Sequence, residues 1–216
     1  MKLLAFTDIH GSYEKTESII RHEASFDGII IAGDLTTIGS AAEAEQALHR
    51  FQSFGKPLFV VSGNMDPPEL DEVFDRMGLL VSGKGAMLGD VGIFGVSGSP
   101  VTPMKTPYEI SEEEIRKRAE KGWREVENAL VKIFVPHAPP HGTTVDKIFI
   151  GKHVGSVALR EFVEKYQPDV LVCGHIHEAR GKDLIGKTLI VNCGPAGKGY
   201  YAVIEVGKEV KVELKG

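Results

Sequence analysis

Cysteine is nearly absent from the 216-residue sequence, in which Cys173 and Cys193 are the only two. Two cysteines cannot build a disulfide scaffold, and each ends an apolar stretch, so we expect two buried, reduced thiols. Long apolar runs are also missing: none approaches the roughly 18 residues that a membrane span requires. The apolar start of the chain ends at Asp8, too early for a signal peptide. We therefore expect a cytoplasmic protein without a membrane partner.

Blocks of Lys and Arg are absent as well, and Asp and Glu outnumber Lys and Arg by 30 to 25, for a net charge of −5. Nucleic-acid binders neutralise phosphates with clustered cations, so the sequence disfavours that class. An apolar content of 42% and a charged content of 25% are typical of a globular protein that builds a full core. We expect one domain over residues 1–216.

Strand and helix patterns alternate along the first third of the chain. Short apolar runs predict strands, and amphipathic stretches between them predict helices. The expected strands are Lys2–Thr7, Gly28–Ala32 and Pro57–Val61, and the expected helices are Ser12–Glu23 and Ser40–Phe54. Strand–helix–strand units of this length are typical of a parallel sheet.

The rest of the chain predicts more strands, two more helices and one long loop. The expected strands are Val91–Val96, Val131–Val135, Val170–Cys173, Thr188–Asn192, Tyr201–Val206 and Val210–Leu214, and the expected helices are Ser111–Leu130 and Val154–Tyr166. The last two strands should form an antiparallel hairpin. Because Gly98–Tyr108 holds three prolines and few apolar residues, we expect a long loop that borders the functional face. Together these patterns predict an α/β fold with mixed sheets.

The segment Gly181–Thr188 matches the spacing of a phosphate-binding P-loop. A P-loop follows a strand and opens a helix, whereas the residues after Thr188 are typical of a strand. We therefore interpret this segment as a turn between two strands.

Side chains that can bind metal ions follow five of the predicted strands. They are Asp8 and His10, Asp34, Asn64, His137, and His175 and His177. Ligands of α/β proteins bind outside the carboxyl ends of strands, so we expect these side chains to meet. Oxygen and nitrogen donors without a thiolate suit Mn²⁺, Fe, Zn²⁺ or Ni²⁺. Seven donors are too many for one tetrahedral ion and fit two ions that share a carboxylate.

In order, the motifs Asp8-x-His10, Gly33-Asp34, Gly63-Asn64-x-Asp66, His137 and Gly174-His175-x-His177 resemble those of the calcineurin-like metallophosphoesterases. The resemblance implies a four-layer α/β/β/α sandwich with two mixed β-sheets. It also implies that Asp8, His10, Asp34 and His177 hold one metal ion, and that Asp34, Asn64, His137 and His175 hold the other. Asp34 then bridges the ions, and catalysis depends on it.

The activity that the resemblance implies is hydrolysis of small-molecule phosphate esters, diesters rather than monoesters. A water that bridges two divalent metal ions would attack phosphorus in line. We expect Mn²⁺ first, with Ni²⁺, Fe or Zn²⁺ as alternatives.

Met65 departs from the family pattern, in which a His stands between the Asn and an acidic residue. That His donates a proton to the leaving group or stabilises charge on the phosphoryl oxygen, and a thioether can do neither. We expect Asn64 and Met65 to face the substrate, and Asp66, which orients the His in the family, to be a catalytic residue of open role. His141 and His153 are candidate replacement proton donors, with idle surface positions as the alternative.

Other functions remain open at this stage. One protein that resembles the family has lost catalysis and serves in protein assembly, so this chain could be a weakly active or non-catalytic metal-binding scaffold. The intact set of seven donors opposes this, because burying so many polar groups is costly unless they bind metal. A nuclease is disfavoured by the net acidity. The physiological substrate, the native metal and the oligomeric state, including a homo-oligomer, stay open.

Overall fold

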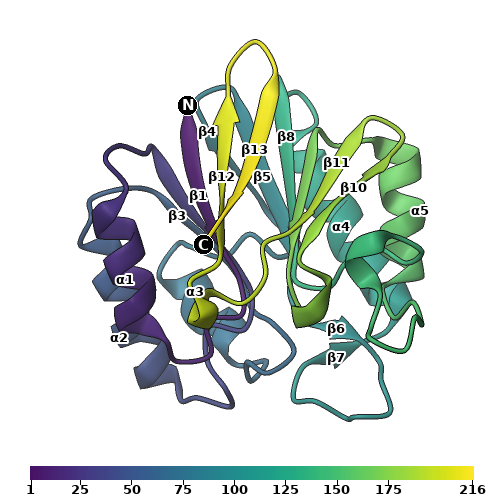
Figure 1. The fold of residues 1–216 in the computed structure, drawn as a ribbon, viewed down its shortest axis with the longest axis horizontal. Coiled ribbons are helices and arrows are strands. Elements are labelled where there is room, and N and C mark those ends of the chain that lie inside the picture. Colours follow the sequence, from purple (N-terminus) through teal and green to yellow (C-terminus); the bar gives the residue numbers. More distant parts are fainter.

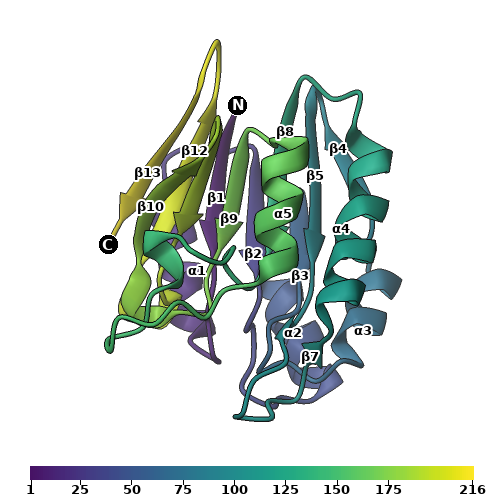
Figure 2. The same ribbon diagram turned by 90° about the vertical axis from the view of Figure 1, so that its right-hand side faces the viewer.

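The computed structural model describes residues 1–216 as two β-sheets packed face to face between two layers of helices (Figures 1 and 2). The strand order is β13-β12-β1-β2-β3 in one sheet and β10-β11-β9-β8-β5-β4 in the other. Both sheets mix parallel and antiparallel neighbours. The predicted four-layer α/β/β/α sandwich with two mixed sheets is confirmed.

The first sheet is built from both ends of the chain. Its strands are β1 (Lys2–Phe6), β2 (Gly28–Ala32), β3 (Leu58–Val61), β12 (Tyr201–Val206) and β13 (Val210–Lys215). Strands β1, β2 and β3 are parallel, and β12 and β13 form the predicted antiparallel hairpin beside β1. The helices that pack on this sheet are α1 (Tyr13–His22), α2 (Ala41–Gln52) and α3 (Leu70–Arg76).

The second sheet uses the middle of the chain. Its strands are β4 (Gly85–Leu88), β5 (Val91–Val96), β8 (Val131–Pro136), β9 (Val170–Cys173), β10 (Gly181–Ile185) and β11 (Thr188–Asn192). The four central strands are parallel, and the edge strands β4 and β10 are antiparallel to their neighbours. Helices α4 (Glu112–Val126) and α5 (Val157–Tyr166) cover its outer face (Figure 2).

Alternation along the strands produces three apolar layers. In β1, Leu4 and Phe6 pack toward α1–α3, whereas Leu3 and Ala5 pack between the sheets. A third cluster fills the space between the second sheet and α4 and α5. Because side chains alternate with a period of two, a slip of one residue would exchange these layers, so burial fixes the register of the strands. This register determines which residues stand at the strand ends.

Several element boundaries differ from the sequence predictions. Helix α3 and strands β4 and β10 were not predicted, and the Gly98–Tyr108 loop is closed by two short strands, β6 (Ser99–Pro100) and β7 (Glu109–Ile110). Helix α5 begins at Val157 rather than at Val154, because the Ser156 hydroxyl accepts a hydrogen bond from the Leu159 amide and caps the helix there. Helix α4 ends at Val126, four residues earlier than predicted.

The P-loop-like segment opens no helix, as expected, but only Gly186 and Lys187 form a turn, because Gly181–Ile185 forms the unpredicted strand β10, which pairs with β11. Cys173 and Cys193 are buried free thiols, as expected. None of the helices combines the length and the apolar character that crossing a membrane demands.

Candidate active site

The carboxyl ends of β1, β2, β3, β8 and β9 meet at one edge of the sandwich, the lower edge in Figure 1. The loops that follow β1 and β2 are joined by backbone hydrogen bonds. The Asp8 amide donates to Gly33 O at 3.0 Å, and the His10 amide donates to Asp34 O at 2.9 Å. Across the second sheet, the Gly174 amide donates to His137 O at 2.9 Å. Backbone contacts thus hold the loops that carry most of the predicted ligands.

Asp8, His10 and His177 form the first set of donors, and their ligand atoms lie within 4.8 Å of one another. His177 Nε2 is 3.2 Å from Asp8 Oδ1. His10 Nδ1 is 3.0 Å from the Thr37 hydroxyl, so its other nitrogen, Nε2, faces the site. A partner on one ring nitrogen is the usual way in which a protein orients a metal-binding imidazole.

Asn64, His137 and His175 form the second set. Asn64 Oδ1 is 3.0 Å from His137 Nε2 and 2.7 Å from His175 Nδ1. His137 is fully buried, and its Nδ1 donates to the carbonyl of Ala32 at 2.9 Å. Because this bond fixes the ring, Nε2 of His137 is the nitrogen available to a metal ion.

Asp34 lies between the two sets. Its Oδ2 atom is 3.5 Å from His10 Nε2 and 3.5 Å from His137 Nε2. Its Oδ1 atom accepts a hydrogen bond from the Met65 amide at 2.7 Å. One carboxylate therefore reaches both sets of donors, which is the position required of a bridging ligand.

Four of these residues have left-handed backbone conformations that side chains other than glycine rarely adopt: Asp8 (φ 50°), His10 (φ 46°), Asp34 (φ 50°) and His175 (φ 67°). Such conformations cost about 1–3 kcal/mol each and persist only where the surroundings enforce them. The neighbouring glycines help to enforce them. A Cβ atom at Gly63 would overlap Asp34 Oδ1, and one at Gly174 would overlap Thr7 Oγ1 and Asp8 Oδ2. The loops that carry the ligands therefore pack so closely that neither glycine position has room for a side chain.

Burial and mutual charge shift the pKa values of the site. Burial opposes ionisation of Asp8, but its hydrogen bond with His177 and the nearby imidazoles lower the pKa of Asp8 to about 2. Burial disfavours the charged form of His137, yet Asp34 and Asp8 raise its pKa to about 9. Burial and the charge of His137 lower the pKa of His175 to about 4. Carboxylates beside several imidazoles form a buried centre that suits divalent cations with mixed oxygen and nitrogen ligands.

Asp66, the catalytic candidate of open role, does not line the cavity. It is fully buried, and its carboxylate accepts hydrogen bonds from the amides of Leu35, Thr36 and Gly63 and from the Thr36 hydroxyl, at 2.8–3.1 Å. Burial and the charge of Asp34 raise the pKa of Asp66 to about 6. Its contacts connect the loops that carry Asp34 and Asn64, so its place in the structure is between loops and not in the cavity.

A cavity of about 550 Å³ opens onto the donors and is lined by His10, Asp34, Asn64, Met65, His175 and His177 among others. Val101, Thr102, Pro103, Met104 and Thr106 also line it, so the Gly98–Tyr108 loop borders the site, as expected. The sequence did not point to Glu109, whose carboxylate accepts four hydrogen bonds from Thr102 and Thr106 and shapes this loop.

The two candidate proton donors differ in position. His153 lines the cavity, whereas His141 is exposed and does not line it. Their rings are 5.9 Å apart. His153 Nδ1 is 2.6 Å from Oδ1 of Asp146, a buried residue that the sequence analysis missed. Its one sequence signal was the Thr143-x-x-Asp146 spacing of a capping box, which the structure contains.

Comparisons with known proteins agree with this geometry. The profile of the calcineurin-like phosphoesterase family matches residues 1–179. The chain is 32% identical over 206 residues to the uncharacterized protein MJ1162 of Methanocaldococcus jannaschii, a match that covers 93% of this chain and 90% of that protein.

Two solved structures share the fold. TT1561 of Thermus thermophilus superposes with a TM-score of 0.79 at 17% identity, over 100% of this chain and 98% of that one. The purple acid phosphatase PPD1 of yellow lupin (Lupinus luteus) superposes with a TM-score of 0.64 at 14% identity, over 100% of this chain and 51% of that one. With the family profile covering most of the sequence, this chain belongs to the calcineurin-like phosphoesterase family, whose members are metal-dependent hydrolases of phosphate esters.

Proposed function

We propose that this chain hydrolyses phosphodiesters of small molecules with the aid of two divalent transition-metal ions, Mn²⁺ being the first candidate and Ni²⁺, Fe or Zn²⁺ the alternatives. The observation that carries the proposal is the position of Asp34 Oδ2, 3.5 Å from a nitrogen of each donor set. Asp8, His10, Asp34 and His177 would hold one ion. Asp34, Asn64, His137 and His175 would hold the other.

When bound, such ions would supply Lewis acidity to the phosphoryl group and lower the pKa of the attacking water. The chain's own residues position these groups. The Ala32 carbonyl orients His137, and the Met65 amide orients Asp34. Met65 lines the cavity, where it would contact the substrate. Asp66 acts through the loops that it connects, as a positioning residue.

The charge of the cavity supports a diester. A monoester is close to doubly charged at neutral pH because its second pKa is about 6, whereas a diester carries one charge. Lys152 is the only Lys or Arg that lines the cavity, and no arginine is there to bind a second phosphate oxygen in bidentate fashion. Beyond the charge of the two proposed metal ions, the cavity lining thus adds one positive charge, which supports a singly charged diester.

His153 is our candidate for the missing proton donor. Asp146 accepts hydrogen bonds from the amides of Gly142, Thr143 and Gly155 and faces His153 Nδ1. This arrangement leaves Nε2 of His153 free to donate. As the P–O bond to the leaving alcohol breaks, the Nε2 proton passes to the leaving oxygen, and a proton from the attacking water replaces it on Nε2. General acid catalysis of this kind contributes typically about 10²–10⁴-fold.

The proposal is tested by metal content and hydrolysis measured together. Purified protein is loaded with Mn²⁺ and assayed with bis(4-nitrophenyl) phosphate and 4-nitrophenyl phosphate. We expect two ions per chain, faster hydrolysis of the diester, and loss of both ions and activity in Asp34→Asn. Asp90→Asn is the matched control, because Asp90 is exposed in the turn before β5, at the opposite end of the strand from the site.

Two results would contradict the proposal in different ways. Two bound ions without hydrolysis of any ester would favour the non-catalytic scaffold. Full metal content in Asp34→Asn would show that Asp34 does not bridge the ions.

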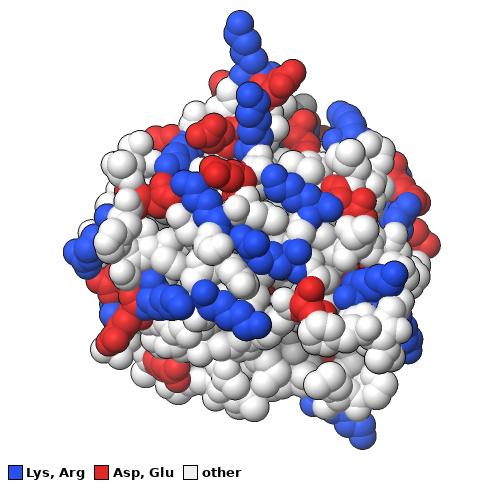
Figure 3. Space-filling model, in the orientation of Figure 1, with Lys and Arg blue, Asp and Glu red and all other residues white.

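We further propose that the protein acts in the cytoplasm and not on nucleic acid. On the face seen in Figure 3, Lys and Arg side chains cross the middle of the face with Asp and Glu side chains beside them, and the net charge of −5 supports a small-molecule substrate. Single-stranded and duplex oligonucleotides added to the same assay should remain intact, and cleavage of either would restore the nuclease alternative.

A further inference from the structure

The cavity that holds the metal donors also has an apolar wall. Met65, Val101, Met104, Ile148, Val154 and Ile176 contribute to it, and they come from four loops of the chain. Five of the ten remaining lining residues are metal donors, and the other five are Thr102, Pro103, Thr106, Lys152 and His153. The hydroxyls of Thr102 and Thr106 donate their hydrogen bonds to Glu109 within the loop, so these protons are not offered to a polar alcohol in the cavity.

Exposed apolar side chains also lie on two of the loops that border this cavity. Phe149 is 91% exposed, Ile150 83%, Met104 81% and Val101 71%. Phe149 and Ile150 directly follow the cavity residue Ile148, and Val101 and Met104 themselves line the cavity. Single exposed apolar residues are ordinary, but a group of them around a binding site marks a surface that contacts something apolar.

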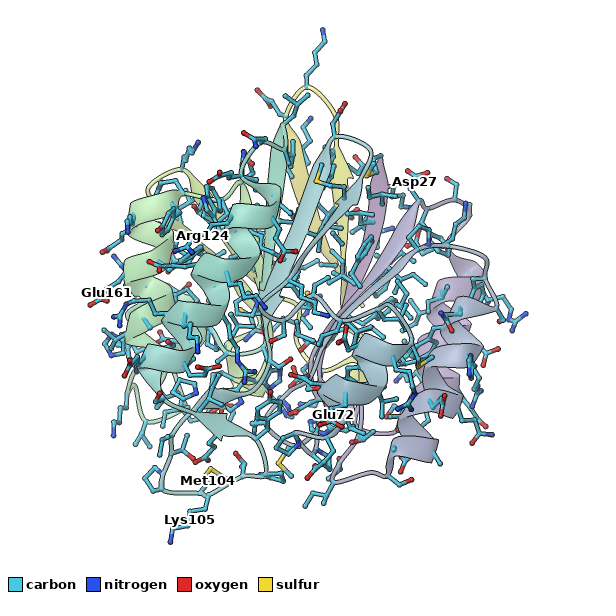
Figure 4. The ribbon with its side chains drawn as sticks, turned by 180° about the vertical axis from the view of Figure 1, so that it is seen from behind. Asp27, Glu72, Met104, Lys105, Arg124 and Glu161 are labelled. Atoms are coloured by element: carbon cyan, nitrogen blue, oxygen red, sulfur yellow. The ribbon has the colours of Figure 1, made fainter.

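Charge is sparse at the same edge of the molecule. In Figure 3, the lower edge, where these loops lie, shows few Lys, Arg, Asp or Glu side chains compared with the upper half. Figure 4 shows Met104 and Lys105 at the tip of the Gly98–Tyr108 loop, with Lys105 extending away from the body of the protein. The loop therefore presents an apolar residue to the cavity side of its tip and a cation to solvent.

We propose that the natural substrate is an amphiphilic phosphodiester, whose phosphate lies at the metal donors and whose alkyl or other apolar chain lies along Val101, Met104, Ile148 and Val154. This inference rests on the proposed function and specifies its substrate class. The apolar wall and the donors line the same cavity, so one molecule can occupy both. Lys152 and the metal centre would attract the phosphate, and the wall would exclude water from the chain.

The test compares ethyl 4-nitrophenyl phosphate with octyl 4-nitrophenyl phosphate on the Mn²⁺-loaded protein. Hydrolysis breaks the P–O bond to nitrophenolate in both, water supplies the new oxygen, and the products differ only in ethyl phosphate against octyl phosphate. We expect kcat/KM for the octyl ester to be higher by about tenfold or more, since each buried methylene is worth up to about fourfold. Direct binding of octylphosphonate against methylphosphonate, measured by calorimetry, should show the same preference without turnover.

Variants of the apolar wall test whether it causes the preference for the octyl ester. Met104→Ser and Val101→Ser should each reduce the octyl-to-ethyl ratio, because each removes apolar surface beside the chain. Leu130→Ser is the matched control: Leu130 is 75% exposed and precedes β8, at the end of that strand opposite to the donors. The ratio in Leu130→Ser should equal that of the wild type.

The outcomes separate this inference from the function on which it rests. If the metal-loaded protein hydrolysed neither ester, the proposed function itself would be contradicted. Hydrolysis of both at equal kcat/KM, with equal phosphonate affinities, would leave that function standing and overturn the amphiphilic substrate. A rate that rises only above the aggregation concentration of the octyl ester, with sedimentation of the protein on phosphatidylglycerol vesicles, would assign the wall to a lipid surface instead. Dimerisation lost in Met104→Ser would assign it to a second copy of the chain.

Discussion

Nδ1 of His153 lies 2.6 Å from the buried carboxylate of Asp146, which is fixed by three backbone amides of the same loop. The carboxylate holds Nδ1, so Nε2 is the ring nitrogen that remains free in a residue that lines the cavity. Burial opposes ionisation of Asp146, but the hydrogen bond from His153 and those from the backbone keep its pKa below the ordinary value. The pair thus combines an ionised carboxylate with an imidazole, as in acid–base dyads of hydrolases.

Replacing His153 should therefore change the dependence of rate on the leaving group. In His153→Asn, hydrolysis of diesters with alkoxide leaving groups should fall by about 10²–10⁴-fold, whereas nitrophenyl diesters should lose little, because nitrophenolate leaves without a proton. The measurement is kcat for a series of diesters of graded leaving-group pKa. His141→Asn is the control, since His141 is exposed outside the cavity. An equal loss across the series would show that His153 does not donate the proton.

Asp66 lies outside the cavity, and we expect its hydrogen bonds to contribute to the stability of the fold. Asp66→Ala would leave the amides of Leu35, Thr36 and Gly63 buried without partners. An unsatisfied buried donor costs about 1–3 kcal/mol, so we expect the free energy of unfolding to fall by about 3–5 kcal/mol. Urea denaturation in excess chelator measures this without a contribution from metal. A change below about 1 kcal/mol would mean that water replaces the carboxylate.

Removal of metal should lower the melting temperature. Each ion that binds only the folded chain at 100 times its dissociation constant adds about 2.7 kcal/mol to the stability. For a chain of this size, each ion therefore corresponds to about 5–11 °C, and the loss of both ions to about twice that. Calorimetry with and without chelator measures the difference, and Asp34→Asn should show a much smaller one. Identical melting curves for the wild type with and without chelator would count against a metal centre.

Glu23 should make the protein sensitive to acid at the far side of the first sheet. Its side chain is 9% exposed and contacts Lys2 Nζ at 2.6 Å, Tyr201 OH at 2.8 Å and Lys215 Nζ at 3.0 Å. Burial opposes ionisation, but these partners lower the pKa of Glu23 to about 2. A carboxyl group whose pKa is lower in the folded state stabilises the protein above its ordinary pKa, and this stabilisation is lost as the pH falls from about 4.5 to about 2.

Glu23→Gln should therefore reduce the free energy of unfolding by about 2 kcal/mol at pH 7 and by almost nothing at pH 2. Glu205→Gln, on the exposed face of β12, is the control and should change stability by less than about 0.5 kcal/mol at either pH. A deficit in Glu23→Gln that persists unchanged to pH 2 would point to lost packing in place of lost charge.

Much of the site could be predicted because its donors directly follow strands with strong apolar signals. The runs that form β1, β2, β8 and β9 are nearly all buried, so their ends, and with them Asp8, Asp34, His137 and His175, could be placed from the sequence. Because these strands run parallel within each sheet, their carboxyl ends, and the donor side chains that follow them, meet at one edge.

Other features lacked a local signal. Strand β4 has no β-branched residue, and β10 carries Lys182 and Asp183, so both edge strands owe their conformation to their neighbours. Likewise, Asp146 and His153 lie in a segment without regular periodicity, and their contact depends on how the backbone of residues 142–155 turns. The place of Asp66 depends on the loop after β2, whose Thr36 lies 30 residues away in sequence.

The close packing of the ligand loops has a genetic consequence. Gly63 and Gly174 offer no donor atom, yet a side chain at either would displace the carboxylate of Asp34 or Asp8. In a saturation library selected for metal content, these two positions should therefore be as intolerant of substitution as the ligands themselves. Intolerance at Gly63 or Gly174 would then reflect the space that the metal centre requires. It would not mean that these residues take part in the chemistry.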